Sequence, residues 1–222
     1  MTRKDTVLHR LLKTKAIAVL REQTAGNAQI LADALSGAGI TTIEITLTTP
    51  GALNTIRSLA DRTDILVGAG SVLSPEQARD AIQAGAQFYA SPCFDSEVLD
   101  TALRAEIVAI PGALTPTEIH AAWKAGADIV KVFPMPAGGA SYIRSILGPM
   151  PELCLAPSGG INAETCTAYL QAGAQALNIG SWLTPADDNV ERRLSTVEER
   201  AGLLRKALEE FDRGGTTTTS AG

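Results

Sequence analysis

The sequence predicts a single (β/α)8 barrel, because helix ends, helix starts and strand-length apolar runs each recur regularly along the chain. Helix ends are marked by Ala-Gly pairs at Gly39, Gly85, Gly126 and Gly173, which are 41 to 47 residues apart. One such interval holds about two strand–helix units of roughly 20–25 residues each. A glycine closes a helix in the left-handed conformation, so the chain can re-enter a sheet within a few residues.

Helix starts are the second regular feature. Hydroxyl residues stand directly before proline at Thr49, Ser74, Thr115 and Thr184. Such a pair predicts an N-cap side chain ahead of a proline at the first helical position. Ser74 also has capping-box spacing with Gln77, and Thr115 has it with Glu118.

Strand-length apolar runs are the third. In the first half of the chain they occupy Ala16–Leu20, Thr42–Leu47, Ile65–Gly68 and Gln87–Ser91. In the second half they occupy Ile107–Ile110, Asp128–Phe133, Leu153–Ala156 and Gln175–Ile179. Each run is followed by a helical segment, and eight such units are the number that closes a barrel. An open doubly wound sheet would show the same alternation and is the alternative fold.

The even spacing of these elements also predicts the domain organisation. No linker or shift in composition interrupts residues 1–213, which we expect to form one barrel domain. Residues 214–222 contain only Gly, Thr, Ser and Ala, so we expect a disordered C-terminal tail.

Composition and charge argue against several kinds of partner. The net charge of −5 and the isoelectric point near 5.1 disfavour nucleic acid and anionic membranes. No run reaches the ~18 apolar residues that a membrane span needs. Arg10, Lys13 and Lys15 interrupt the stretch where a signal peptide would be apolar, so we expect a cytoplasmic location.

Cysteines and histidines offer little for binding a metal ion. Cys93, Cys154 and Cys166 are an odd number without a short-spaced pair, and His9 lies far from His120. We therefore expect reduced thiols, no disulfide framework, no metal site and no cofactor.

Lys131 carries the strongest chemical signal. It lies in the apolar run Asp128–Phe133, where strand alternation puts Val130 and Val132 on one face and Lys131 on the other. Burial disfavours the charged form of a lysine and so makes its amine nucleophilic. Near the carboxyl end of a barrel strand, such an amine can form an imine with a carbonyl substrate. The alternative is a structural ion pair with an inward carboxylate.

Glu44 is the expected partner of Lys131. In the run Thr42–Leu47 the aliphatic residues Ile43 and Ile45 share one face, so Glu44 takes the other. If the aliphatic face meets the helices, Glu44 points into the barrel and can move protons, directly or through one water. It could also serve as the counter-ion of the lysine, and the two roles are compatible.

Glycine-rich loops follow the last two predicted strands, where barrels usually bind phosphate. Residues 158–162 read Ser-Gly-Gly-Ile-Asn, with Asn162 as the expected cap of the next helix, and residues 180–182 read Gly-Ser-Trp. Glycines let backbone N–H groups approach an anion. A double glycine alone is more often a turn, but the two loops together indicate a phosphate site.

Two residues are candidates for binding a substrate carboxylate. Ser71 ends Gly68-Ala-Gly-Ser71, which we expect to be a turn after the third strand, although a solvated turn serine is the alternative. Arg21 follows the first strand and could clamp a carboxylate, or it could lie on the surface.

Together these motifs resemble the KDPG/KHG aldolase family, the 2-keto-3-deoxy-6-phosphogluconate and 4-hydroxy-2-oxoglutarate aldolases. The resemblance runs from about Lys15 to Pro185. It rests on motifs in the family's order, at Ala18–Arg21, Glu44–Thr48, Gly68–Val72, Ser91–Pro92, Ile110–Gly112, Lys131–Pro134, Ser158–Ile161 and Gly180–Trp182.

The resemblance implies a homotrimeric class I aldolase of Entner–Doudoroff carbohydrate metabolism. It would split 2-keto-3-deoxy-6-phosphogluconate into pyruvate and glyceraldehyde 3-phosphate, and also 4-hydroxy-2-oxoglutarate into pyruvate and glyoxylate. Lys131 would form the Schiff base and Glu44 would act as acid and base. Ser71, Pro92 and Phe133 would contact the pyruvyl unit. The phosphate would be held by Gly159, Gly160, Gly180 and Ser181.

The chain departs from the family's pattern at two positions. Thr48 stands where many members have an arginine that helps bind the substrate carboxylate. Other members carry an arginine after the first strand, where this chain has Arg21. Binding of the carboxylate has therefore either passed to Arg21 or been lost. Ser158 replaces the usual threonine but keeps a hydroxyl. These departures leave open the galactonate-derived epimer and unphosphorylated 2-oxo acids as substrates.

Two other classes of protein compete with an aldolase. A sugar-phosphate epimerase or isomerase would use the same glycine loops without covalent chemistry, but it would usually need a metal or a pair of inward acids. A non-catalytic barrel is the other alternative. Lys131 and Glu44 argue against it, because folding requires neither.

Overall fold

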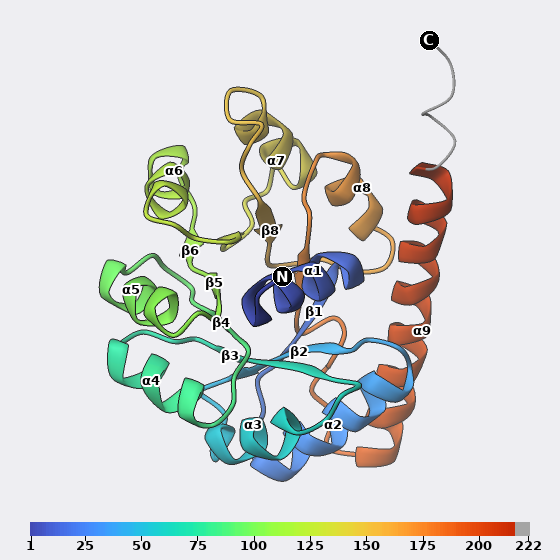
Figure 1. The fold of residues 1–222 in the computed structure, drawn as a ribbon. Coiled ribbons are helices and arrows are strands. Elements are labelled where there is room, and N and C mark those ends of the chain that lie inside the picture. The colour runs from blue at the N-terminus through green and yellow to red at the C-terminus, as the bar shows by residue number, and fades with distance from the viewer. Residues whose placement is uncertain (216–222) are drawn as a thin grey trace.

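The computed structural model describes residues 1–215, in which short strands alternate with helices (Figure 1). The strands are β1 Ala16–Leu20, β2 Thr42–Thr46, β3 Leu66–Gly70, β4 Phe88–Ala90, β5 Val108–Ile110, β6 Gly112–Ala113, β7 Val130–Val132, β8 Leu155–Pro157 and β9 Leu177–Ile179. The helices are α1 Arg3–Thr14, α2 Ala25–Gly37, α3 Ala52–Ala60, α4 Pro75–Gln83, α5 Ser96–Arg104, α6 Pro116–Lys124, α7 Ala140–Leu147, α8 Cys166–Gln171 and α9 Val190–Gly215. Each predicted strand overlaps an observed one.

The strands form two parallel sheets, ordered β5-β4-β3-β2-β1-β9 and β6-β7-β8. The sheets adjoin at two places. At Pro111, β5 leads directly into β6, and a parallel bridge joins Ser158, after β8, to Asn178 in β9. The result is an α/β fold whose parallel sheet is curled and surrounded by helices (Figure 1).

Alternate strand residues divide between two apolar clusters. The outer cluster packs the strands against the helices and includes Ile43, Val130 and Val132. The inner cluster lies within the curl of the sheet and includes Phe88 and Ile129. Because successive strand residues point to opposite faces, the neighbours of a residue in the outer cluster point inward.

Helix α1 covers the amino-terminal end of the strands. Val7 and Leu11 on this helix belong to the inner apolar cluster. Arg10 donates hydrogen bonds to the carbonyl oxygens just ahead of β3, and Lys4 pairs with Asp128 ahead of β7 at 3.0 Å. The amino-terminal end of the curled sheet is therefore closed by α1.

The predicted helix ends are confirmed at all four Ala-Gly pairs. The backbone φ angle lies between 90° and 104° at Gly39, Gly85, Gly126 and Gly173. These values lie in the region that favours glycine. Each of the four helices therefore ends where the pattern predicted.

The predicted helix starts are confirmed at Ser74 and Thr115, whose hydroxyls accept N-cap hydrogen bonds. Two others are wrong. α3 begins after Gly51, because the Thr49 hydroxyl instead accepts a hydrogen bond from the backbone N–H of Glu22, at 3.0 Å. Thr184 lies in a turn closed onto Gly180, and α9 begins only at Val190.

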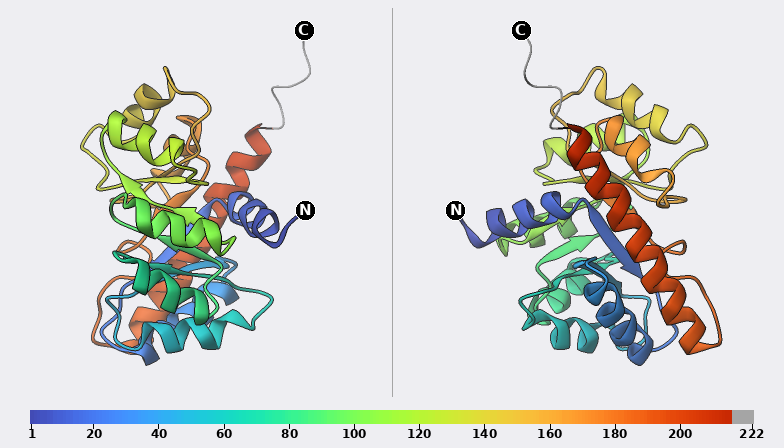
Figure 2. Two further views of the ribbon diagram at one scale, coloured as in Figure 1. Left: turned by 60° about the vertical axis from the view of Figure 1, so that its left-hand side comes forward. Right: turned by 90° about the vertical axis from the view of Figure 1, so that its right-hand side faces the viewer.

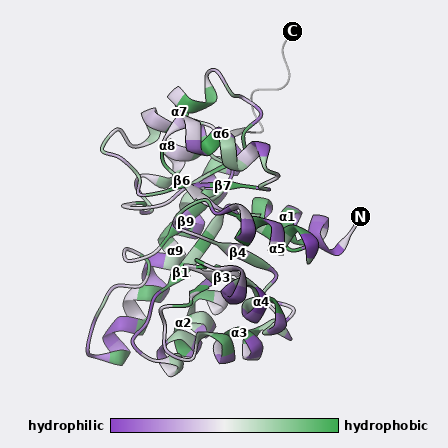
Figure 3. Cartoon of the chain, turned by 90° about the vertical axis from the view of Figure 1, so that its left-hand side faces the viewer, coloured by the Kyte–Doolittle hydropathy of each residue, from purple (hydrophilic) through white to green (hydrophobic). Residues whose placement is uncertain are grey.

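The surroundings of the sheet add three facts. The helices carry both polar and apolar residues (Figure 3), and α9 runs diagonally across one side of the molecule (Figure 2). No helix within residues 1–215 is long and apolar enough to cross a membrane. α9 extends through Gly215, and the rest of the predicted tail, residues 216–222, lies outside the described residues.

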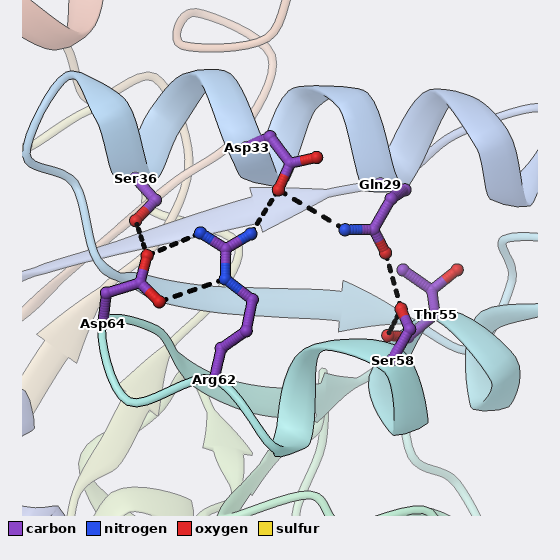
Figure 4. A network of polar contacts seen from close by, with 7 residues as sticks. All are labelled: Gln29, Asp33, Ser36, Thr55, Ser58, Arg62 and Asp64. Carbon is purple, nitrogen blue, oxygen red and sulfur yellow. Dashed lines mark hydrogen bonds and ion pairs between the residues drawn. The ribbon is translucent and has the colours of Figure 1, made fainter.

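A polar network joins α2, α3 and the loop before β3 (Figure 4). At its centre Arg62 pairs with Asp33 and with Asp64, whose Oδ2 also accepts a hydrogen bond from Ser36 at 2.8 Å. A second arm passes from Asp33 through Gln29 to Ser58. The network ties two neighbouring helices to the loop that leads into β3.

Candidate active site

A cavity of about 570 Å³ opens at the carboxyl ends of the strands. Nine of the residues predicted to serve catalysis or binding line it: Arg21, Ser71, Pro92, Lys131, Phe133, Gly159, Gly160, Gly180 and Ser181. The volume lies within the usual range for small-molecule sites, about 300–1,000 Å³. The structure therefore gathers loops from across the sequence around one cavity.

Lys131 lies on β7, and its side chain points inward as the strand alternation predicted. Val130 and Val132 pack in the outer cluster, which leaves the lysine for the cavity side. Its Nζ lies 3.4 and 3.5 Å from the two carboxylate oxygens of Glu44 and 5.9 Å from the centre of the Phe133 ring. Only 6% of Lys131 is exposed, so the amine is shielded from bulk water yet reaches the cavity.

Glu44 lies on β2, almost fully buried at 1% exposure. Its side chain passes over Gly70 of β3. This follows from the space at Gly70, where an added Cβ would lie only 2.1 Å from Glu44 Oε1. In the same way, a Cβ at Gly68 would lie 2.5 Å from the Phe88 ring. The prediction of a turn over Gly68–Ser71 is thus wrong for all its residues except Ser71, which follows the strand. Both glycines belong to β3 and leave the inner side chains the space that they occupy.

Ser71 is the first residue after β3 and has a left-handed backbone, with φ of 56°. For a residue with a Cβ this conformation costs about 1–2 kcal/mol. Strained backbone conformations of this kind are common at functional sites. Ser71 lines the cavity, together with Pro92 from the loop after β4.

The two glycine loops meet at one side of the cavity. Gly159 and Gly160 have φ angles of 120° and 69°, which favour glycine. Asn162 accepts hydrogen bonds from the backbone N–H groups of Glu164 and Thr165, both at 2.9 Å, and so caps the turn that leads into α8. Gly180 and Ser181 follow β9 on the same wall. Backbone N–H groups of such loops suit an anion.

Arg21 and Thr48 are separated by the fold. Arg21 is exposed and lines the cavity, and within residues 1–215 its guanidinium makes no hydrogen bond or ion pair. Thr48 does not line the cavity. Its hydroxyl lies 2.9 Å from that of Thr46, and the residue lines a different surface depression with Pro50 and Gln77. The structure therefore leaves Arg21 as the nearer candidate for a carboxylate.

Among the cavity residues that the sequence analysis missed, two have side chains held by hydrogen bonds. Arg193 of α9 binds the carboxylate of Glu22 through both terminal nitrogens, at 2.8 and 2.7 Å. Asn178 of β9 is 1% exposed and donates a hydrogen bond to the Ala156 carbonyl oxygen at 3.2 Å. Asn178 could have been identified from the sequence in the same way as Lys131, because it is a polar residue in an apolar strand. Nothing in the sequence pairs Arg193 with Glu22.

The Lys131 amine, the Arg21 guanidinium and a pair of anion-binding loops line one cavity, and the Glu44 carboxylate lies buried beside the amine. A buried amine beside a carboxylate can exchange its proton with that carboxylate and then attack a carbonyl carbon. The glycine loops follow β8 and β9 at the same cavity and can hold the charged end of the same substrate.

Comparison with known proteins points to one family. The sequence model of "KDPG and KHG aldolase" matches residues 7–198. The chain is 36% identical over 183 residues to the 2-dehydro-3-deoxy-phosphogluconate aldolase of Pseudomonas aeruginosa, with 82% of each chain covered. It is 32% identical over 200 residues to the 2-dehydro-3-deoxy-6-phosphogalactonate aldolase of Escherichia coli, which covers 89% of this chain and 96% of that one.

A solved structure gives the same result. It is that of a KDPG aldolase from Legionella pneumophila with pyruvate captured at low pH as a covalent carbinolamine intermediate. The TM-score is 0.78 at 31% sequence identity, with 92% of this chain and 98% of that chain covered.

Proposed function

Because the chain belongs to the KDPG and KHG aldolase family, a family of carbon–carbon lyases, we propose that it cleaves 2-keto-3-deoxy-6-phosphogluconate through a Schiff base on Lys131. The products are pyruvate and glyceraldehyde 3-phosphate. The observation that carries the proposal is the buried Lys131–Glu44 pair at the cavity, 3.4 Å apart. A buried ion pair contributes little net stability, so its position at a cavity is better explained by chemistry.

The reaction follows from this pair. Glu44 takes a proton from Lys131, and the free amine attacks the C2 carbonyl carbon to give a carbinolamine. Loss of water, with a proton from Glu44, leaves the iminium. The C3–C4 bond then breaks, its electron pair moves to the iminium as an enamine, and the C4 hydroxyl proton passes to the Glu44 carboxylate, directly or through one water. Protonation at C3 and hydrolysis release pyruvate and restore the amine.

The remaining predicted residues orient the substrate. Ser71, Pro92 and Phe133 surround the pyruvyl unit, and Arg21 binds its carboxylate. The phosphate lies at the two loops after β8 and β9, which present Gly159, Gly160, Gly180 and Ser181. This orientation of the substrate is supported by the cavity lining, which includes both Lys131 and these loops.

We propose that residues 1–213 act as one domain and that the two sheets together form a closed (β/α)8 barrel. In it, β5 and β6 are one strand interrupted at Pro111, so that the nine short strands within residues 1–215 count as eight. The hydrogen bond from the Lys131 N–H to the Pro111 carbonyl oxygen, at 2.9 Å, supports a continuous edge there. The homotrimeric state and the Entner–Doudoroff role rest on the resemblance alone, and the cytoplasmic location remains an expectation from the sequence. Light scattering of the purified protein tests the trimer.

A galactonate-series substrate is the second candidate. Arg21 lines the cavity whereas Thr48 does not, and the Escherichia coli relative that shares 32% identity is a phosphogalactonate aldolase. Rates on the two epimers, measured side by side with 4-hydroxy-2-oxoglutarate, decide between these substrates.

The experiment that tests the mechanism is reductive trapping. The protein is incubated with pyruvate, reduced with borohydride and analysed by mass spectrometry, and we expect a pyruvyl adduct on Lys131. Lys131→Met should remove the adduct and the aldol cleavage while circular dichroism shows a folded protein. No adduct on the folded wild type would refute the Schiff base and favour an epimerase or a non-catalytic barrel.

A further inference from the structure

Asn178 places an amide in the otherwise apolar β9. Its neighbours Leu177 and Ile179 pack in the outer cluster, so the Asn178 side chain points inward. It lines the same cavity as Lys131 and is 1% exposed. A buried amide in a strand is costly unless its donors and acceptor are satisfied.

Only one end of this amide is satisfied. Its Nδ2 donates to the Ala156 carbonyl oxygen at 3.2 Å, whereas its Oδ1 has no hydrogen-bond partner within residues 1–215. Rotating the amide by half a turn would bring Oδ1 against that carbonyl, two acceptors facing each other. The orientation is therefore fixed, and the buried Oδ1 of this cavity-lining residue is left as an unpaired acceptor within residues 1–215.

A free acceptor selects a donor, and few groups of the proposed substrate can donate. At neutral pH the carboxylate offers only acceptors, as does the phosphate in its dianionic form. The hydroxyls on C4 and C5 are the donors. Among the cations that line the cavity, Lys131 already faces Glu44 and Arg193 already binds Glu22. The exposed Arg21 is not within hydrogen-bond distance of Asn178 Oδ1.

The position of Asn178 favours the C5 hydroxyl. Its backbone bridges Ser158, which opens one glycine loop, and it lies two residues before Gly180, which opens the other. Those loops are the proposed phosphate site, and C5 is the carbon next to the one that bears the phosphate.

From these contacts, and resting on the proposed function, we infer that Asn178 is a specificity-determining residue. Its Oδ1 accepts a hydrogen bond from the hydroxyl next to the phosphate-bearing carbon of the aldehyde-derived half. Substrates without that hydroxyl leave the buried acceptor unpaired and are disfavoured.

The test compares two aldehydes in the addition of pyruvate. One is glyceraldehyde 3-phosphate, and the other is 3-oxopropyl phosphate, which differs only in lacking the relevant hydroxyl. For the wild type we expect kcat/KM to be at least about tenfold higher with the hydroxylated aldehyde. In Asn178→Leu, which has a similar shape but no acceptor, this ratio should fall to near one. Asn178→Ala, smaller and easier to accommodate, should give the same loss of preference.

Pyruvate trapping separates the failure of this inference from that of the proposed function. If the folded wild type forms no reduced pyruvyl adduct, the proposed function fails and the inference fails with it. If the wild type and both variants trap pyruvate, but the ratio between the aldehydes stays as in the wild type, only the role of Asn178 is refuted. A variant that does not fold is excluded by circular dichroism, and the other variant decides.

Discussion

Gly70 fixes the position of the carboxylate in the Lys131–Glu44 pair. The Glu44 side chain lies flat across β3, and Lys131 reaches it from β7 on the other sheet. The two charges meet because the residue between their strands has no side chain. The geometry of the reacting pair therefore depends on the absence of a Cβ atom at Gly70.

Gly70→Ala should therefore damage catalysis without touching a reacting residue. The new Cβ would lie 2.1 Å from Glu44 Oε1, so the carboxylate must move. A displacement of about 1 Å can cost 100-fold in rate, and overpacking costs about 1–3 kcal/mol of stability. We expect kcat to fall about 10- to 100-fold and the urea midpoint to decrease. Gly202→Ala is the matched control, because nothing lies within 4 Å of its added Cβ and it sits in α9. Equal kinetics in the two variants would contradict this account.

At the scale of elements, the network around Arg62 joins α2 and α3 to the start of β3 (Figure 4). Hydrogen bonds from Arg62, and then from Ser36, hold the pKa of the Asp64 carboxyl well below its usual range. A carboxyl with a lowered folded-state pKa releases its proton more readily in the folded state than in the unfolded one. Its contribution is complete above the ordinary carboxyl pKa, near 4, and is lost as the pH falls through the folded value.

Asp64→Asn should consequently destabilise the protein in a pH-dependent way. At pH 7 its urea midpoint should lie below that of the wild type, because Arg62 and Ser36 lose a charged acceptor. As the pH falls below about 4 the two midpoints should converge. Asp100→Asn serves as the control, since Asp100 pairs only loosely with Arg104, at 3.9 Å on an exposed helix face. A difference between Asp64→Asn and wild type that stays constant from pH 7 to pH 3 would show that the charge is not its cause.

For the whole molecule, the sequence predicted what local periodicity controls. Strand alternation was sufficient to turn Lys131 and Glu44 inward, and both are found there. Strand alternation could not show that β3 continues through Gly70. Two closely spaced glycines indicate a turn unless it is known that other side chains, here Phe88 and Glu44, occupy the space beside them. Nor could it reveal β6, since Pro111 ended the apolar run. The positions of Thr48 and Arg193 depend on packing between segments far apart in the chain, which no local pattern records.

The Arg193–Glu22 pair is the long-range contact with the largest expected effect on the whole fold. It fastens α9 to the loop after β1, which connects the C-terminal helix to the first strand at the wall of the cavity. Both side chains are largely buried, at 11% and 3% exposure, and Arg193 Nε also donates to the Pro185 carbonyl oxygen at 2.7 Å.

Arg193→Met would leave the Glu22 carboxylate buried without its partner, which typically costs about 3–5 kcal/mol. We expect this loss in the free energy of unfolding measured by urea denaturation. Arg192→Met is the matched control on the same helix, since Arg192 is 68% exposed where it pairs with Asp187, and such surface pairs contribute about 0–1 kcal/mol. The double variant Glu22→Gln with Arg193→Met should recover part of the loss, because it no longer buries an unpaired charge. If Arg193→Met were no less stable than Arg192→Met, α9 would be held by its apolar contacts, and the ion pair would serve only to shape the cavity wall.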